Sequence, residues 1–345
     1  MTPVSKTRRS PRIGLWQIIK FGVALLLVGF VLSRTSWSEQ VAVWQHISLP
    51  WLLLSMVAYY GSLVVMARRS WALLDQAVPF GELLEVTIIK TVVTNTIADS
   101  AGLVSYLAVL RRQHRVAISS GIASIIMARL ADIVILGSVI VAAGALDWHQ
   151  MGILHGVTLL LGSGALFLGL LLLATVLFRR WVVINLHRLS CYTHLDRFAL
   201  TQRMVVTLTT LSDIDTTSLR RKIIQVLGYA VLTQGLTFAF AYCNMQLFHV
   251  AIEPVSLVLV VALSQLLSLI PIQVLGGLGV YDFTMLYLFG LFGLTQATMI
   301  PVLIGLRIIF YVYILILLLY HPWHRHRQRL AQRPFSGDKL AQESL

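Results

Sequence analysis

Charged residues and cysteines are scarce in this sequence. Only 12% of its 345 residues are charged and 57% are apolar, whereas roughly 25% of an ordinary globular chain is charged. These values exclude a soluble globular protein and a disordered chain, and they are typical of a polytopic membrane protein. The two cysteines, Cys191 and Cys243, lie in a basic loop and in an apolar segment, which excludes a disulfide scaffold.

Sequence motifs for nucleotide and metal chemistry are missing as well. There is no Gly-rich loop of Walker type, which argues against direct use of ATP, and the ten histidines have no spacing typical of a zinc or two-metal site. The stretch 34–48 offers only Glu39, whereas a membrane glycosyltransferase would need carboxylates there to hold a metal or act as a base. We therefore expect no cofactor and no metal.

Long apolar runs, in contrast, are abundant, and a helix of about 20 apolar residues crosses a bilayer core of about 30 Å. Runs that suffice are residues 13–32, 49–66, 118–143, 153–178, 223–248 and 299–320. Two further apolar regions, 83–110 and 257–294, have a polar or glycine-rich break in the middle. We predict an all-α polytopic membrane protein with about eight transmembrane segments, including two broken or re-entrant hairpins.

The net charge of +13 indicates the membrane topology through the positions of the basic residues, because short cytoplasmic loops retain lysine and arginine. If the N-terminus lies inside and 83–110 enters and leaves on one side, most of the 27 basic residues lie inside. If 83–110 crossed once, most arginines would lie outside. We therefore expect a multi-pass protein of the cell inner membrane with both termini in the cytoplasm. Topology explains the basic charge, so no nucleic-acid partner is expected.

The domain organisation follows from the same pattern. Residues 1–320 are predicted to form a single transmembrane domain, and residues 321–345 a basic cytoplasmic tail. The first run is too long for a removable signal peptide and should remain as a signal anchor. Within the domain, the basic stretch 179–222 has apolar residues at helical spacing, which predicts a helix in the cytoplasmic interface.

The two broken regions share an order of parts, which predicts an internal repeat. Gly102 precedes Tyr106 by four residues, Gly277 precedes Tyr281 by the same number, and an arginine follows on the next helix in both. In the threading above these next helices run in opposite directions, so the repeat would be inverted, as in many transporters. Alternatively, any two apolar hairpins with glycine turns would align over a few residues.

Two arginines lie within predicted spans, where a charge costs about 2.5–3.5 kcal/mol and is retained where it is paired or faces water. Arg307 has no acid within one turn, so Asp282 after the second break is its natural partner. Arg129 has two candidate partners, Asp132 on its own helix and Asp99 in the first break. These pairs either pin helices together or contact a substrate, and the sequence leaves both readings open.

The order of residues at the second break is specific: Pro271, Gly276, Gly277, Gly279, Asp282 and Arg307. Together with residues 95–132, this region resembles the signature regions of the lysylphosphatidylglycerol synthase transmembrane family of flippase-like proteins, and the likeness spans about 66–320. In the first region Ala98 and Leu103 replace the proline and acid usual in the family. The resemblance implies re-entrant elements and a substrate that is an anionic or aminoacylated phospholipid or a lipid-linked sugar.

The resemblance also bears on catalysis. Bifunctional relatives carry a soluble aminoacyl-transferase domain after the membrane part, whereas this sequence ends soon after its last apolar run. We therefore expect that the protein is not an enzyme that synthesises aminoacyl lipid. The leading hypothesis is a flippase-like transporter that moves an anionic, aminoacylated or polyprenyl-linked headgroup between leaflets. The alternatives are a membrane-embedded enzyme or accessory subunit of lipid glycosylation, and a scaffold that does not transport.

In the leading hypothesis the arginines hold phosphate, the acids balance them, and the glycines let the backbone approach the substrate. Half-helix N-termini after Gly102 or Gly279 would also suit a phosphate. The candidate substrate-binding residues are Arg129, Arg307, Asp99, Asp282, Gly102, Gly276, Gly277, Gly279, Tyr106 and Tyr281. The expected partners are an anionic phospholipid or polyprenyl-phosphate-linked lipid, the membrane, and an enzyme of lipid or glycan synthesis.

Overall fold

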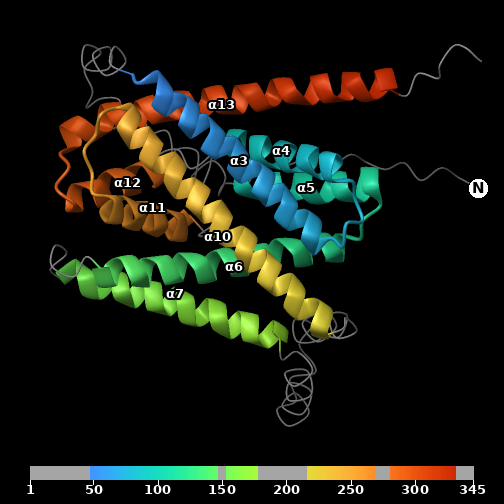
Figure 1. Ribbon diagram of the computed structural model, residues 1–345, viewed down its shortest axis with the longest axis horizontal. Coiled ribbons are helices and arrows are strands. Elements are labelled where there is room, and N and C mark those ends of the chain that lie inside the picture. Colours follow the sequence, from blue (N-terminus) through green and yellow to red (C-terminus); the bar gives the residue numbers. More distant parts are fainter. Residues whose placement is uncertain (1–46, 147–152, 178–215, 269–279, 332–345) are drawn as a thin grey trace, which may run out of the picture.

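The computed structural model describes residues 47–146, 153–177, 216–268 and 280–331 of the chain. Over these residues the protein is helical and contains no strand, which confirms the predicted fold class. Its helices are α3 (Leu49–Leu73), α4 (Phe80–Thr96), α5 (Asp99–His114), α6 (Ile118–Leu146), α7 (Ile153–Leu177), α10 (Thr216–Leu247), α11 (Pro254–Ser268), α12 (Val280–Leu291) and α13 (Gln296–Ala331) (Figure 1).

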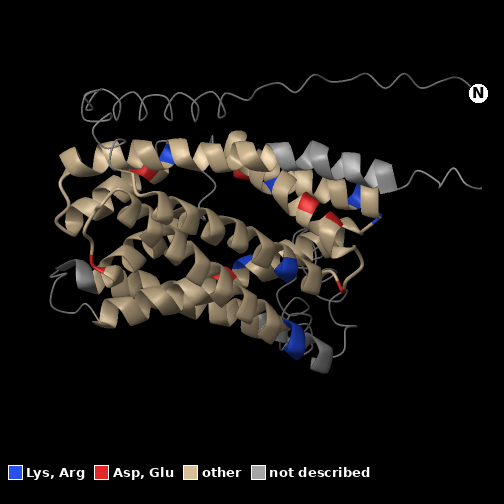
Figure 2. Cartoon of the chain, turned by 45° about the horizontal axis from the view of Figure 1, so that its top comes forward, with Lys and Arg blue, Asp and Glu red and all other residues tan. Residues whose placement is uncertain are grey.

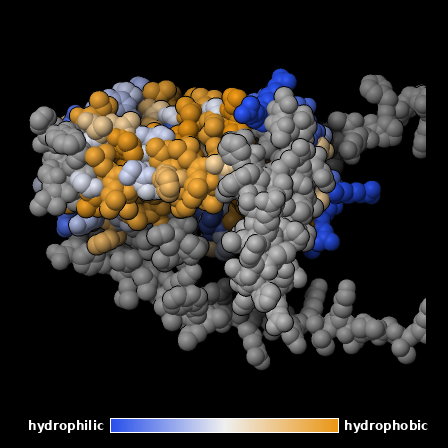
Figure 3. Space-filling view, turned by 90° about the horizontal axis from the view of Figure 1, so that it is seen from below, coloured by the Kyte–Doolittle hydropathy of each residue, from blue (hydrophilic) through white to orange (hydrophobic). Residues whose placement is uncertain are grey.

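Helices long and apolar enough to cross a membrane are found within α3, α6, α7, α10 and α13. Each coincides with a predicted run, and the remaining run, 13–32, lies outside the described residues. Helix α13 continues to Ala331, beyond the expected end at residue 320. Many leucine, isoleucine and valine side chains of these helices are exposed, and Figure 3 shows a broad apolar surface with hydrophilic residues at one end. Such a surface is suited to contact with lipid.

One end of the molecule is basic. Helices α3 and α5 end there and α10 begins there (Figure 1), and Lys222 of α10 forms an ion pair with Asp75 after α3. Figure 2 shows most of the described lysines and arginines in the same half of the molecule. The predicted threading requires this arrangement, because it places the ends of these three helices on one side of the membrane.

The first broken region forms a hairpin of α4 and α5, separated by residues 97–98. Glu82, near the start of α4, forms an ion pair with His114 at the end of α5 at 3.0 Å, so the helices run antiparallel. Gly102 lies where they touch, because an added Cβ there would be 2.9 Å from the Lys90 carbonyl oxygen. With 17 and 16 residues, both helices are shorter than the span of about 20 residues that crosses a bilayer.

The second broken region is built in the same way. Over the described residues, helices α11 and α12 have 15 and 12 residues, which is shorter than the span of about 20 residues that crosses a bilayer core of about 30 Å. Their apolar faces share one buried cluster that includes Val260, Val261, Met285 and Phe289. Two half-helices therefore stand where the sequence predicted a broken segment, and the break itself, 269–279, lies outside the described residues.

The two broken units run in opposite directions. In Figure 1, α4 runs from right to left, α5 from left to right and α6 from right to left, whereas α11, α12 and α13 run in the opposite direction at each step. The hairpins enter from opposite ends, and their inner ends meet, because Asn95 near the end of α4 and Ser268 at the end of α11 line the same cavity. This arrangement favours the inverted repeat over a chance alignment of glycine turns.

Candidate functional site

The second unit brings Asp282 and Arg307 together. Asp282 lies in the first turn of α12 and Arg307 in α13, and the Arg307 Nε donates a hydrogen bond to the Asp282 Oδ1 at 2.7 Å. The side chains are 17% and 13% exposed. The Arg307 Cζ also lies 5.7 Å from the centre of the Tyr281 ring, in cation–π range. The ion pair predicted from the sequence is present, and its guanidinium is held on two sides.

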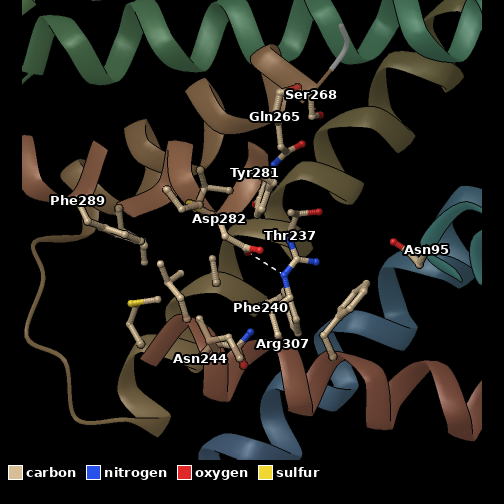
Figure 4. Close-up of a pocket in the computed structure, with 18 residues that line it drawn as sticks. Asn95, Thr237, Phe240, Asn244, Gln265, Ser268, Tyr281, Asp282, Phe289 and Arg307 are labelled. Carbon is tan, nitrogen blue, oxygen red and sulfur yellow. Dashed lines mark hydrogen bonds and ion pairs between the residues drawn. The ribbon is translucent and has the colours of Figure 1, made fainter. Parts of the chain in front are cut away.

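A cavity of about 290 Å³ surrounds this ion pair. It is walled by α10, α11, α12 and α13 and reached by one residue of α4. Its lining residues are Asn95, Thr237, Phe240, Ala241, Asn244, Met245, Leu257, Val261, Gln265, Ser268, Tyr281, Asp282, Met285, Phe289, Leu303, Leu306, Arg307 and Phe310. Figure 4 shows the polar side chains converging on the Arg307 guanidinium from several helices. A largely apolar wall with a few convergent polar groups is the usual composition of a ligand site.

Two buried amides in this wall are incompletely paired. Asn244 is only 4% exposed, and its Oδ1 has no hydrogen-bond partner among the described residues. The buried Nε2 of Gln265 also has no hydrogen-bond partner among the described residues. A buried polar atom without a partner costs about 1–3 kcal/mol, so these two amides are positions where a bound polar group would stabilise the protein.

The first unit has its own ion pair, between Arg129 of α6 and Asp99 at the start of α5. The Arg129 Nη2 donates to the Asp99 Oδ2 at 3.2 Å, and the side chains are 42% and 36% exposed. Arg129 is not among the residues that line the cavity. The two arginines of the repeat are therefore in different surroundings, and Arg307 alone of the two lies in that cavity.

Asp132 does not pair with Arg129 along α6, as the sequence had allowed. Instead its two carboxylate oxygens accept hydrogen bonds from Nη1 and Nη2 of Arg69 at 2.5 and 3.2 Å. Arg69 is buried, because α3 continues to Leu73 and turns this residue toward α6. In the sequence, Arg69 stands beside Arg68 just after the apolar run 49–66, as a loop charge would, and the continuation of α3 to Leu73 is not visible there.

The remaining candidates of the first unit lie inside the hairpin. Tyr106 is buried, and the Lys90 Nζ lies 5.6 Å from the centre of its ring. Helix α5 begins at Asp99, so Gly102 lies within the helix and the expectation of a helix N-terminus after Gly102 is wrong. The glycine is used for close packing of α4 on α5. The Asp99 carboxylate itself occupies the first turn, where it complements the helix dipole.

The candidates at the second break are only partly covered. Gly276, Gly277 and Gly279 lie outside the described residues. Helix α12 is described from Val280 on, at the edge of the described residues, so the half-helix N-terminus expected after Gly279 stays a prediction. The first turn of this helix contains Asp282, so both half-helices of the repeat start with an acid that pairs with an arginine on the following helix.

Sequence reasoning missed the amides Asn95, Asn244 and Gln265. All three lie in or beside apolar segments, where a side chain that needs several hydrogen bonds is retained only with partners or water. A search for amides as well as charges within the spans would have found them. Among the described residues no group of three or more His, Cys, Asp or Glu could hold a metal ion.

A family model described as the lysylphosphatidylglycerol synthase TM region matches residues 17–318, which is most of the chain. No curated protein and no solved structure matches.

Proposed function

This chain belongs to the lysylphosphatidylglycerol synthase transmembrane family, and from that premise we propose that it is a flippase-like lipid transporter. It moves an anionic, aminoacylated or polyprenyl-linked lipid headgroup between the two leaflets of the membrane. The proposal is supported chiefly by one observation: two half-helix hairpins of opposite direction meet where the cavity around Arg307 and Asp282 lies.

The energetic problem in such transport is the headgroup. A charged group at the centre of a bilayer costs several kcal/mol, while the acyl chains can remain in lipid throughout. A path lined with paired charges and amides replaces the water that the headgroup loses. Half-helices suit this path because they end near the middle of the membrane. Their free backbone N–H and C=O groups can contact a headgroup there, whereas a continuous helix offers only side chains at that depth.

The ion pair gives the path a way to accept and release an anion. When a phosphate enters, the Arg307 guanidinium, which has several donors in one plane, contacts it while still near Asp282. When the phosphate leaves, Asp282 again neutralises the arginine. Because the carboxylate competes with the phosphate, binding stays weak enough for release. In the first unit, Arg129 and Asp99 form a similar pair that is more exposed, and their part in this exchange is smaller.

We propose transport rather than catalysis because of the carboxylates that line the cavity. Asp282 is the one acid among its described lining residues, and it is held by Arg307. Most enzymes that hydrolyse glycosidic bonds use two carboxyl groups at a defined separation. Partner enzymes of lipid or glycan synthesis would then supply or consume the transported lipid.

The basic end of the molecule sets the proposed orientation. The end of α3, the end of α5 and the start of α10 carry exposed arginines, namely Arg68, Arg111, Arg112, Arg115, Arg220 and Arg221, and the positive-inside rule assigns them to the cytoplasm. Helix α11 then starts from the opposite side of the membrane (Figure 1). The location is the cell inner membrane, with both termini in the cytoplasm.

Reconstitution tests the proposal directly. Purified protein in liposomes should speed the transbilayer movement of headgroup-labelled phospholipids or polyprenyl-phosphate lipids, measured by chemical quenching of the outer-leaflet label. The double variant Arg307→Ala/Asp282→Ala removes both charges together and so leaves neither buried alone; it should fold but lose the acceleration. If the wild-type protein accelerates no lipid of a broad panel above empty liposomes, transport is rejected in favour of a scaffold or an enzyme.

A further inference from the structure

The polar groups that line the cavity include both hydrogen-bond donors and hydrogen-bond acceptors. The amides of Asn244 and Gln265 each carry one donor group and one acceptor. The hydroxyls of Thr237 and Ser268 donate to backbone carbonyls, of Thr233 at 2.9 Å and of Gln265 at 2.7 Å. Their protons are therefore committed, and their oxygens face a ligand as acceptors. In Figure 4 these side chains surround the same space on several sides.

The described wall of the cavity carries no net charge. Arg307 and Asp282 are its charged residues, and they are paired with each other at 2.7 Å. A site for a multiply charged anion would be expected to hold unpaired cations, and a site for an ammonium group an excess of acids. Neither excess is found in the described lining residues.

The two amides provide the second, independent sign of a ligand. The buried Oδ1 of Asn244 and Nε2 of Gln265 have no hydrogen-bond partner among the described residues. Asn244 comes from α10 and Gln265 from α11, so the two amides lie on different walls of the cavity. A group with hydrogen-bonding capacity at several points would satisfy both at once.

The apolar part of the wall is rich in aromatic rings. Phe240, Phe289, Phe310 and Tyr281 line the cavity, and flat rings of this kind pack well against the C–H face of a saturated ring. The volume of about 290 Å³ corresponds to roughly ten water molecules at about 30 Å³ each. This space holds a single sugar or polyol unit rather than a chain of them.

We infer that this cavity binds an uncharged, hydroxyl-bearing unit of the headgroup, namely a single sugar or polyol. A hydroxyl group both donates and accepts, and so matches a mixed wall, whereas phosphate only accepts and ammonium only donates. The inference names the headgroup class of the transporter proposed above and rests on that proposal. The phosphate of the same lipid lies toward the Arg307 guanidinium at the edge of the unit.

Lipid binding to the full-length protein tests this inference. The protein is purified without sugar detergents and placed in phosphatidylcholine nanodiscs, and the binding of four probes is measured by native mass spectrometry. The probes are monoglucosyl diacylglycerol, phosphatidylglycerol, phosphatidic acid and phosphatidylethanolamine. The first two should bind at least about tenfold more tightly than the others, since each lost hydrogen bond to a buried group costs about tenfold. Equal binding of phosphatidic acid or phosphatidylethanolamine overturns the inference.

The two bound classes separate the sources of the hydroxyl groups. Preference for the glucosyl lipid identifies a sugar headgroup, and preference for phosphatidylglycerol identifies a polyol attached to phosphate. Both support the inference, because the shared chemistry is the uncharged polyhydroxyl unit.

Substitutions localise the binding. Asn244→Leu and Gln265→Leu should each weaken binding of the preferred probe by about tenfold without lowering thermal stability, because each removes a polar atom that has no partner in the described residues. Gln234→Leu is the matched control, since Gln234 is a buried amide of α10 outside the cavity lining. If both cavity variants bind like the wild type, or if Gln234→Leu weakens binding equally, the cavity is not the site.

Binding in nanodiscs requires no translocation, so the two proposals fail separately. If the preferred probe binds and no lipid is translocated in liposomes, transport is wrong and the headgroup site stands. If all labelled lipids are translocated at one rate and Asn244→Leu has no effect on rate or binding, the transporter stands and the headgroup inference is wrong.

Discussion

The first hairpin, α4 with α5, and the second, α11 with α12, share one plan but differ in the surroundings of their ion pairs. In both, an acid in the first turn of the second half-helix pairs with an arginine of the next long helix. Arg307 and Asp282 are largely buried and line a cavity, whereas Arg129 and Asp99 are more than a third exposed.

The difference shows that the two units of an internal repeat can share a backbone arrangement while their polar side chains serve different purposes. In the first unit a second, buried ion pair, Arg69 with Asp132, fastens α3 to α6, and Gly102 lets α4 and α5 touch. In the second unit a cavity surrounds the ion pair, and three amides are among its lining residues. We therefore propose that the first unit mainly holds helices together and that the second binds a ligand, so substitutions in the two should have different consequences.

The largest effect is expected for the buried pair of the first unit. Arg69→Ala leaves the Asp132 carboxylate without its bidentate partner, and breaking a buried pair on one side costs about 3–5 kcal/mol. The apparent melting temperature of the purified protein should fall sharply. The double variant Arg69→Leu/Asp132→Leu should recover most of the loss, because no charge is then left unpaired. A single variant that melts like the wild type would show that the pair contributes nothing to the first unit.

The next effect concerns the cavity of the second unit. Arg307→Gln removes a charge-assisted hydrogen bond, worth about 1.5–3 kcal/mol, and should reduce translocation of an anionic lipid by roughly 10- to 100-fold in liposomes. Arg307→Lys keeps the charge but loses the planar donor group, and its translocation rate should lie between those of the wild type and Arg307→Gln. Arg112→Gln, an exposed arginine at the end of α5, is the control and should keep the wild-type rate. A wild-type rate in Arg307→Gln contradicts a role for this arginine.

A smaller effect separates the packing of the two units. Gly102→Ala places a Cβ 2.9 Å from the Lys90 carbonyl oxygen, so α4 and α5 must move apart, at a cost of about 1–3 kcal/mol. Gly290→Ala in α12 meets open space and should stabilise that helix by up to about 1 kcal/mol, since alanine favours the helix. Thermal unfolding of both variants checks the contrast. If the melting temperatures of both variants shift in the same direction, the close contact at Gly102 does not limit stability.

Much of the fold was predictable because the thickness of the bilayer fixes the length of the apolar segments that cross it. Apolar length alone located the spans that became α3, α6, α7, α10 and α13, and polar breaks located the half-helices. The pairing of Asp282 with Arg307 was predictable because no acid lies within a turn of that arginine and Asp282 is the acid that follows the second break. These features depend on composition along the chain, which a sequence displays directly.

Other features depended on the direction of single side chains, which the sequence does not display. Arg69 follows Arg68 in a basic pair that resembles a loop end, yet one is buried and the other exposed on the same helix. Gly102 was assigned to the break itself, but the break falls at residues 97–98 and the glycine serves helix contact. Asn244 and Gln265 were hidden by apolar neighbours, because mean hydropathy over a window does not register a single amide.

The smallest effect should come from the exposed pair of the first unit. Arg129→Gln breaks an ion pair at 3.2 Å whose side chains are 42% and 36% exposed, and pairs of this kind contribute about 0–1 kcal/mol. Thermal stability should therefore change little, and translocation should fall less than in Arg307→Gln, measured with the same lipid in the same liposomes. A loss equal to that of Arg307→Gln would mean that the headgroup uses both arginines equally. The two units would then share the chemistry as well as the backbone plan, and the division of roles drawn from their different burial would be wrong.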